Sequence, residues 1–411
     1  MTSLPADADT DLANFARSLE QSRLVRTDDV ARLFTGQVSA ADAANHLVTT
    51  GTLTRYQADK LLTGRWQGLV LGPYRILHPA GRGGMGLVYR AAKEGAAEPV
   101  ALKILPPKRA EERPQTLSRF KREMRIGRIV PPHPNVVATV DSGVIDGVYF
   151  LAMEYVPGPT LKQRVAKLGA MPVETVAHLF TRAATGLAAV HSAGVVHRDV
   201  SPGNLILTPA GDVKLLDFGV AIVAGEPLPA DPTVAGGKGY TMGTMDYIAP
   251  EQVRDAAAAT FASDLYALGC SLYFALTGTP PYPGGDSRQK IRWHKRAEAP
   301  PVNAINPLVP AELSYLVERL MAKSPADRPD SAIAVAHELL SFAPAEEWPD
   351  PIGHAIEAWD SKLDPSDEGE VEEWPVELPR PFGAVRTLIV LLVLLLGGLI
   401  VLLVLLVIKQ R

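Results

Sequence analysis

The sequence predicts an α+β fold in which a small, sheet-rich part precedes a larger helical part. Short runs rich in valine, isoleucine and tyrosine recur from about residue 71 to residue 153, among them Val100–Ile104 and Tyr149–Met153. Such runs are typical of strands. Longer runs with helical periodicity come later, among them Val173–Ser192 and Phe261–Leu276. Because strands are followed by helices rather than alternating with them, the pattern is that of an α+β fold.

The composition excludes two classes of protein. The 411 residues include 41 basic and 45 acidic side chains, a net charge of −4. There is therefore no basic excess with which to bind nucleic acid. Cys270 is the one cysteine, which excludes an internal disulfide framework and indicates a reducing compartment.

Residues 12–70 predict a module of short helices after a polar start at residues 1–11. Ser39–Asp42 and Thr54–Gln57 each have the pattern of a capping box before an apolar run. No catalytic constellation is found in this stretch. It is either a docking module or a helical extension packed on the next domain.

The C-terminal region predicts a membrane anchor. Residues 388–408 form a run of 21 residues without a charge, and a helix of that length, about 31 Å, crosses a hydrocarbon core of about 30 Å. We therefore expect a transmembrane helix over 387–408 and a tail at 409–411. The preceding residues, 343–386, predict a solvated, proline-containing acidic linker. Basic residues are equally frequent on both sides of the span, so charge alone leaves its orientation open.

A glycine-rich run lies between two predicted strands and follows the pattern G-x-G-x-x-G-x-V. Glycine lets backbone N–H groups approach phosphate oxygens closely. A dinucleotide-binding fingerprint would need a helix directly after the glycines, but Leu87–Arg90 has the pattern of a strand. The candidate phosphate-covering residues are Gly81, Arg82, Gly83, Gly84, Met85, Gly86 and Val88.

Lys103 lies in the apolar strand that follows. Burying an ammonium group is costly unless it has partners, and the economical partners are phosphates and a carboxylate. Glu123, in the helical stretch Arg119–Glu123, is the best candidate carboxylate. Gly127, four residues later, weakens this helix by roughly 1 kcal/mol relative to alanine, which favours a helix that can move.

Oxygen-bearing side chains recur in the next part of the chain. Asn204 follows Asp199 by five residues, and Asp217 follows Asn204 by thirteen. These side chains can surround one locus, and Mg²⁺ prefers oxygen ligands while keeping waters or phosphates. Taken alone, His197 is interpreted as a packed structural histidine.

Seven motifs occur in an order and spacing that are together specific. They are the glycine run, V-A-L-K at 100–103, H-R-D at 197–199, D-F-G at 217–219, A-P-E at 249–251, S-D-L-Y-A-L-G at 263–269 and A-D-R-P at 326–329. Together they resemble the eukaryotic-like (Hanks-type) serine/threonine protein kinase family, closest to its bacterial membrane-anchored members. The resemblance implies a bilobal protein kinase domain over 71–342, with a small β-rich lobe and a large helical lobe.

The resemblance implies that ATP is the cofactor. The backbone of the glycine run would cover its phosphates, and Lys103 would hold the α- and β-phosphates while pairing with Glu123. Ala101 and Val88 belong to the same nucleotide site. Met153 would be the gatekeeper, and backbone groups from Glu154 to Val156 would meet the adenine edge.

The resemblance also assigns the chemistry. Asp199 would accept or orient the proton of the attacking hydroxyl, and Asn204 and Asp217 would hold Mg²⁺. The late arginine of the family, here Arg328, would pair with Glu251 of the A-P-E segment.

One position departs from the family. Most members have a lysine two residues after the catalytic aspartate, where this chain has Ser201. Losing that charge is expected to slow transfer, because a contact made in the transition state contributes a few kcal/mol. Arg198 beside Asp199 is the family's signature of control by phosphorylation of the activation loop, and Thr233 and Thr241 are the candidate phosphosites.

The sequence thus predicts an ATP- and Mg²⁺-dependent kinase that acts on serine and threonine in proteins. It would be anchored in the bacterial inner membrane with its kinase domain in the cytoplasm, where ATP is found. Gly397 and Gly398 leave dimerisation through the span open. Two alternatives remain: a nucleotide-binding pseudokinase scaffold, which Ser201 motivates, and a small-molecule phosphotransferase, which the A-P-E segment opposes.

Overall fold

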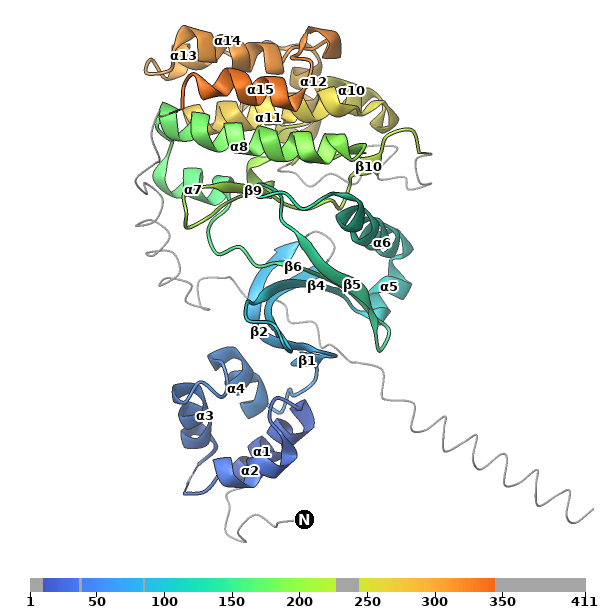
Figure 1. Ribbon diagram of the computed structural model, residues 1–411, viewed down its shortest axis with the longest axis vertical. Helices are drawn as coiled ribbons and strands as arrows, with labels where there is room; N and C mark the ends of the chain where they lie inside the picture. Colours follow the sequence, from blue (N-terminus) through green and yellow to red (C-terminus); the bar gives the residue numbers. More distant parts are fainter. Residues whose placement is uncertain (1–9, 37–38, 84–85, 227–243, 344–411) are drawn as a thin grey trace, which may run out of the picture. The chain divides into compact units, whose positions relative to one another are not determined.

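The computed structural model describes residues 10–36, 39–83, 86–226 and 244–343 (Figure 1). Its contacts divide the described chain into two compact units. One contains residues 10–76 with 144–148, and the other contains the remaining described residues.

The first unit is a bundle of four short helices followed by a two-residue strand. Phe15, Leu19, Leu47 and Leu61 fill its core and are at most 2% exposed. The predicted capping box of Thr54 is present in both directions. The elements are α1 (Thr10–Ser22), α2 (Thr27–Leu33), α3 (Ala40–Thr49), α4 (Arg55–Leu62) and β1 (Val70–Leu71).

The helical part of this unit forms hydrogen bonds with the first residues of the next strand, β2 (Tyr74–Gly83). The buried Gln57 amide donates a hydrogen bond to the carbonyl of Ile76, and the Arg75 guanidinium donates one to the carbonyl of Thr52. β1 also pairs antiparallel with Tyr74 and Arg75. The four helices are therefore joined by side-chain and backbone bonds to residues 74–76, which belong to the same unit.

The second unit begins with a twisted sheet in which the strand order is β2-β3-β4-β6-β5. Lys103 lies opposite Val88 on one neighbouring strand and opposite Leu151 on the other. Helices α5 (Pro107–Glu112) and α6 (Pro114–Ile129) lie beside this sheet (Figure 1). The elements after β2 are β3 (Gly86–Lys93), β4 (Val100–Leu105), α5 (Pro107–Glu112), α6 (Pro114–Ile129), β5 (Thr139–Ile145) and β6 (Val148–Glu154).

The larger lobe of the second unit is mostly helical. Its central helix is α11 (Phe261–Thr277), which is buried from Ser263 to Leu276 and packs against α8 (Val173–Ser192) and α14 (Ala311–Leu320). The other elements are α7 (Leu161–Leu168), β7 (Val195–Val196), η1 (Pro202–Asn204), β8 (Leu205–Leu207), β9 (Val213–Leu215), β10 (Ile222–Val223), η2 (Thr244–Asp246), α10 (Pro250–Arg254), η3 (Ala256–Ala258), α12 (Ser287–Arg296), α13 (Val302–Ile305), η4 (Pro325–Asp327) and α15 (Ala332–Leu340).

The predicted succession of a sheet and then helices is confirmed. The segment after the glycines is a strand, as its pattern indicates, and the helix predicted at 173–192 has those bounds. The predicted span over 387–408, its linker from residue 344 and its tail lie outside the described residues. Within the residues that the structure describes, no helix has the length and apolar character needed to cross a membrane.

Candidate active site

The first feature of the site is a buried ion pair between strand β4 and helix α6. The Lys103 ammonium lies 2.6 Å and 2.8 Å from the two carboxylate oxygens of Glu123, and both residues are at most 3% exposed. Burial opposes the charge on Lys103, but the carboxylates of Asp217 and Glu123 outweigh it and raise its pKa. The sequence prediction that Glu123 is the partner of Lys103 is therefore confirmed as a contact.

Asp217 lies on the other side of the same ammonium group. Its Oδ1 is 3.7 Å from Lys103 Nζ and accepts a hydrogen bond from the N–H of Gly219 at 2.8 Å. Burial works against its charge, but Lys103 and the Gly219 N–H lower its pKa, so the carboxylate is ionised. Its φ of +64° is in the left-handed region, a conformation that non-glycine residues adopt at a cost and that is often found at functional sites.

Asp199 and Asn204 are joined by hydrogen bonds within one loop. The Asn204 amide donates to the backbone carbonyl of Asp199 at 2.8 Å and to its Oδ2 at 2.9 Å. The other carboxylate oxygen, Oδ1, is buried and has no hydrogen-bond partner within the described chain. Burial and the nearby charge of Asp217 raise the pKa of Asp199 to about 7. This carboxylate is therefore suited to exchange a proton near neutral pH.

The loop that carries Asp199 is held by Asp264, a fully buried carboxylate on α11. It accepts hydrogen bonds from the backbone N–H groups of His197 and Arg198 at 2.8 Å and 2.7 Å, and it lies 2.9 Å from His191 Nε2. Arg198 has a φ of +69°, and these bonds help to hold that strained backbone. Asp264 is part of the S-D-L-Y-A-L-G motif at 263–269, but the sequence alone assigned it no role. The available signal was one aspartate within a helix that is otherwise almost wholly apolar.

Backbone contacts bring the three oxygen-bearing residues to one locus. The N–H of Leu216 donates to the carbonyl of Asn204 at 2.8 Å, which places Asn204 beside the residue that precedes Asp217. No cluster of three or more His, Cys, Asp or Glu residues suited to a metal is found among the described residues. The carboxylate of Asp217 and the amide oxygen of Asn204 are donors of the kind that Mg²⁺ prefers, and the ion would retain waters and phosphates as its other ligands.

The candidate adenine end of the site lies where β4 meets β6. Ala101 is directly opposite Met153, and Val100 is opposite Glu154. The Glu154 carboxylate is 2.8 Å from Lys214 Nζ, so its side chain is already paired. The buried Val156 follows in the connection to the helical lobe. Of the glycine run, Gly84 and Met85 lie outside the described residues, while Gly81, Arg82 and Gly83 end β2 and Gly86 and Val88 lie at the start of β3.

Two further predicted positions are found in the helical lobe. Arg328 makes a bidentate contact with Glu251, at 2.7 Å and 2.9 Å, so this predicted pair is present. Ser201 is 9% exposed and directly precedes η1, and its carbonyl accepts the N–H of Asn204 at 2.9 Å. Its side chain supplies no positive charge beside Asp199.

Comparison with known proteins agrees with this arrangement. The family model "Protein kinase domain" matches residues 74–340. The chain belongs to the protein kinase family. The kinase domain is 36% identical over 278 residues to the serine/threonine-protein kinase PknH of Mycobacterium bovis, a match that covers 67% of this chain and 45% of that protein. It is 33% identical over 263 residues to the serine/threonine-protein kinase PrkC of Bacillus subtilis, covering 64% of this chain and 39% of that protein.

A solved structure shows the same fold for the kinase domain. The crystal structure of the Mycobacterium tuberculosis PknI kinase domain superimposes with a TM-score of 0.50 at 29% identity, covering 67% of this chain and 98% of that one. The bilobal protein kinase fold predicted from the sequence is therefore confirmed. The chain spans less than half the length of the curated relatives named above.

Proposed function

We propose that this chain is an active protein kinase that transfers the γ-phosphoryl group of ATP, with Mg²⁺, to serine and threonine hydroxyls of proteins in bacterial signalling. The observation that carries the proposal is the position of Lys103, which pairs with Glu123 at 2.6 Å and lies 3.7 Å from Asp217. Phosphoryl transfer requires mainly positioning and charge neutralisation, and these residues supply both.

Each residue then has a defined task. Lys103, held by Glu123, binds the α- and β-phosphates, and the backbone of residues 81–86 covers the phosphates. Asp199 orients the substrate hydroxyl and takes up its proton at a carboxylate oxygen. Asn204 and Asp217 would hold Mg²⁺, which when bound neutralises charge on the phosphates. Met153 and the backbone from Glu154 to Val156 bind the adenine.

The test is transfer of label from γ-labelled ATP by the full-length chain to itself and to a generic protein substrate. We expect label on serine or threonine that depends on Mg²⁺ and is lost with a chelator. The Asp199→Asn variant separates this activity from that of a copurifying kinase. Retained ATP binding without any label would instead favour the scaffold alternative, in which the kinase domain recruits partners without transfer.

Ser201 leads to a prediction of increased activity. Replacing Ser201 with lysine is expected to raise the rate of transfer about tenfold, because the new charge can contact the γ-phosphate in the transition state. Ser201→Met is the matched control, since methionine adds bulk without charge. Initial rates at saturating ATP provide the measurement. Equal rates for both variants would show that this position does not limit transfer.

Arg198 supports control by phosphorylation of the activation loop. Its Nε is buried without a hydrogen-bond partner in the described part of the chain, and its Nη1 reaches only the carbonyl of Val220, at 3.4 Å. A phosphate on the loop would supply the missing acceptor. The candidates, Thr233 and Thr241, lie outside the described residues.

We expect mass spectrometry of the wild-type chain after incubation with Mg²⁺ and ATP to find a phosphate on one of these two threonines. The Asp199→Asn chain, treated in the same way, should lack it. Wild-type protein that is active with every hydroxyl between residues 217 and 251 unmodified would contradict this mode of control.

The segments on either side of the kinase domain also have roles in the proposed function. Residues 387–408 would anchor the protein in the bacterial inner membrane. The linker at 343–386 would connect this anchor to the kinase domain of 71–342 in the cytoplasm. The helices of 12–70 would bind a partner or pack against the kinase domain. Dimerisation through the span stays open. Full-length protein is expected in the membrane fraction and to resist an alkaline wash, whereas a chain ending at residue 386 is expected to be soluble.

A further inference from the structure

Helix α12 is fixed by one face to the helical lobe. It contacts η2 and also α10, which contains the last two residues of the A-P-E motif. Lys290 forms an ion pair with Asp246 of η2 at 2.5 Å, and both side chains are at most 15% exposed. One turn later, Nδ1 of the buried His294 lies 2.8 Å from the hydroxyl oxygen of Tyr266 on α11. The face of α12 that carries Lys290 and His294 is therefore held in place.

The opposite face of α12 carries only positive charge. Its cations are separated by three or four residues, which places them in one stripe along the helix. This α12 stripe consists of Arg288, Arg292, Lys295 and Arg296. The three arginines are exposed and the lysine is partly exposed. α12 contains no acidic residue, and none of the four cations forms an ion pair with a carboxylate in the described part of the chain.

The charges of the stripe have a cost in the helix itself. Like charges three or four residues apart repel each other, by roughly 0.2–0.5 kcal/mol per pair on an isolated helix. The helix dipole favours Lys295 and Arg296 in the last turn but opposes Arg288 in the first. A negatively charged partner on the stripe would remove this repulsion. Exposed side chains of one sign would also attract such a partner from a distance.

The chain itself contains a segment of matching charge. Residues 346–380, which lie outside the described residues, carry 12 acidic and 2 basic side chains. At about 3.5 Å per residue, this segment can extend about 120 Å from residue 343, whereas a lobe of this size is about 40 Å across. It is therefore long enough to reach α12 from the end of α15. Because both belong to one chain, it also has a higher effective concentration than a separate acidic protein.

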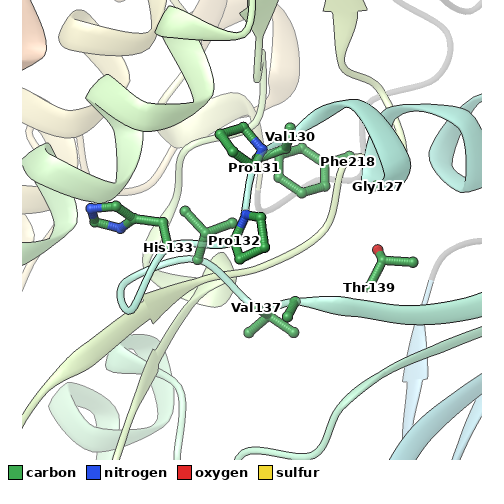
Figure 2. A pocket seen from close by; sticks show the side chains of 10 residues that line it. Gly127, Val130, Pro131, Pro132, His133, Val137, Thr139 and Phe218 are labelled. Carbon is green, nitrogen blue, oxygen red and sulfur yellow. The ribbon is translucent and has the colours of Figure 1, made fainter.

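The pocket between the end of α6 and the start of β5 does not provide another site for this segment (Figure 2). Val130, Pro132, Val137 and Phe218 are among its lining residues, and the lining includes no lysine or arginine. Carboxylates placed there would lose their hydration without gaining a cation. Of these two places, the α12 stripe is the one whose charge matches the acidic segment.

We propose that the acidic segment of residues 346–380 binds the α12 stripe and reduces the access of protein substrates to the active site. Gln252 on α10 donates a hydrogen bond to the carbonyl of Arg198 at 3.4 Å, and Arg198 directly precedes Asp199. A segment held along α12 beside α10 would therefore lie next to the catalytic loop. The inference rests on the proposed function, because it assigns a control of that active site. Lys103, on β4, is not covered, so ATP binding should not change.

The experiment uses full-length variants and an uncharged threonine-containing peptide as the substrate. The linker variant replaces the 12 acidic residues of 346–380 with asparagine or glutamine, and the stripe variant is Arg288→Gln/Arg292→Gln/Lys295→Gln/Arg296→Gln. Each is expected to raise kcat/KM for the peptide about tenfold, within the 5- to 150-fold range of coupled sites. The two sets combined should give no further increase, because they remove the same contact. KM for ATP should stay within about twofold of the wild type.

The matched control changes the net charge by the same amount at four exposed cations elsewhere on the chain. It is Arg17→Gln/Arg23→Gln/Lys108→Gln/Arg182→Gln, and it should keep the wild-type kcat/KM within about twofold. Equal rates in the wild type, the stripe variant and the linker variant would overturn the proposal. A lower rate in the stripe variant would also overturn it, since the stripe would then assist the substrate instead of excluding it.

A second readout does not require phosphate transfer. A carbodiimide couples a lysine amine to a carboxylate that touches it, and Lys295 is the one lysine of the stripe. In the wild type at low salt, we expect mass spectrometry to find Lys295 coupled to a carboxylate between residues 346 and 380. The coupling should disappear in Arg288→Gln/Arg292→Gln/Arg296→Gln, which keeps Lys295, and in about 1 M salt, where charges are screened beyond about 3 Å.

The two readouts together separate this proposal from the proposed function. If the wild type transfers no phosphate but shows the salt-sensitive coupling, the linker binds the stripe and the proposed activity fails. An active wild type without the coupling, and with the same kcat/KM as the stripe variant, would refute the binding of the linker alone.

Discussion

Replacing Asp199 with asparagine is expected to lower phosphate transfer by about 10²- to 10⁴-fold, the range over which general base catalysis contributes. The substitution keeps the shape of the side chain, and the new amide oxygen can still accept the hydrogen bond that Asn204 donates to Oδ2 at 2.9 Å. The loop should therefore keep its conformation. What is lost is a carboxylate oxygen, buried and without a partner in the described chain, that can take up a proton.

Initial rates with labelled ATP measure this effect, and binding of a fluorescent ATP analogue shows whether the site is otherwise intact. The matched control is Asp212→Asn, an aspartate that accepts hydrogen bonds from Asn135 and Val213 rather than facing Asp217. It should keep the wild-type rate within about twofold. Wild-type transfer by the Asp199→Asn variant would mean that another group takes the proton or that the activity belongs to a contaminant.

The contacts that the sequence predicted correctly either join residues close in the chain or involve a buried charge that needs a partner. The capping box at Thr54 lies within four residues and depends only on local chemistry. The pairing of Lys103 with Glu123 joins two separate elements. It could nevertheless be predicted, because burying an ammonium group in an apolar strand is costly without a partner, and a carboxylate is one of its economical partners. Arg328 and Glu251 were paired through the family resemblance alone.

The contacts that the sequence did not predict depend on how distant segments meet. Asp264 accepts backbone N–H groups from residues 66 and 67 positions earlier, and no local pattern indicates which groups a buried carboxylate will contact. Gly127 was interpreted from its helix propensity, whereas its close approach to Thr139 appears only when α6 lies against β5. The same limit applies to the backbone of Arg198 and Asp217, whose positive φ is set by tertiary contacts rather than by residue type.

Replacing Arg328 with methionine is expected to lower the free energy of unfolding by about 3–5 kcal/mol, as breaking a buried ion pair generally does. Arg328 is 4% exposed and binds both oxygens of Glu251, and it also donates to the carbonyls of Ala262 and Ala322. The variant would leave a carboxylate and two carbonyls without this partner. Urea unfolding at pH 7 measures the loss. Arg319→Met breaks the more exposed pair with Glu338 and should cost no more than about 1 kcal/mol.

The pH dependence of this loss distinguishes the ion pair from packing. Burial works to raise the pKa of Glu251, but the hydrogen bonds and charge of Arg328, with the hydroxyl of Ser263, outweigh it and lower the pKa below its ordinary value of 4.5. A carboxylate with a depressed pKa stabilises the folded state above its unfolded-state pKa, and this contribution is lost as the pH falls through the folded-state pKa.

The difference in unfolding free energy between the wild type and Arg328→Met should therefore be constant from pH 7 down to about 5. It should shrink below pH 4.5, as protonated Glu251 leaves Arg328 without its anion in the wild type as well. The Arg319→Met difference should be small throughout. A loss in Arg328→Met that stays unchanged down to the lowest pH at which both proteins fold would assign the effect to the packing of the arginine side chain instead. In that case the pairing of Glu251 with Arg328 would fix the geometry of the A-P-E segment without stabilising the domain.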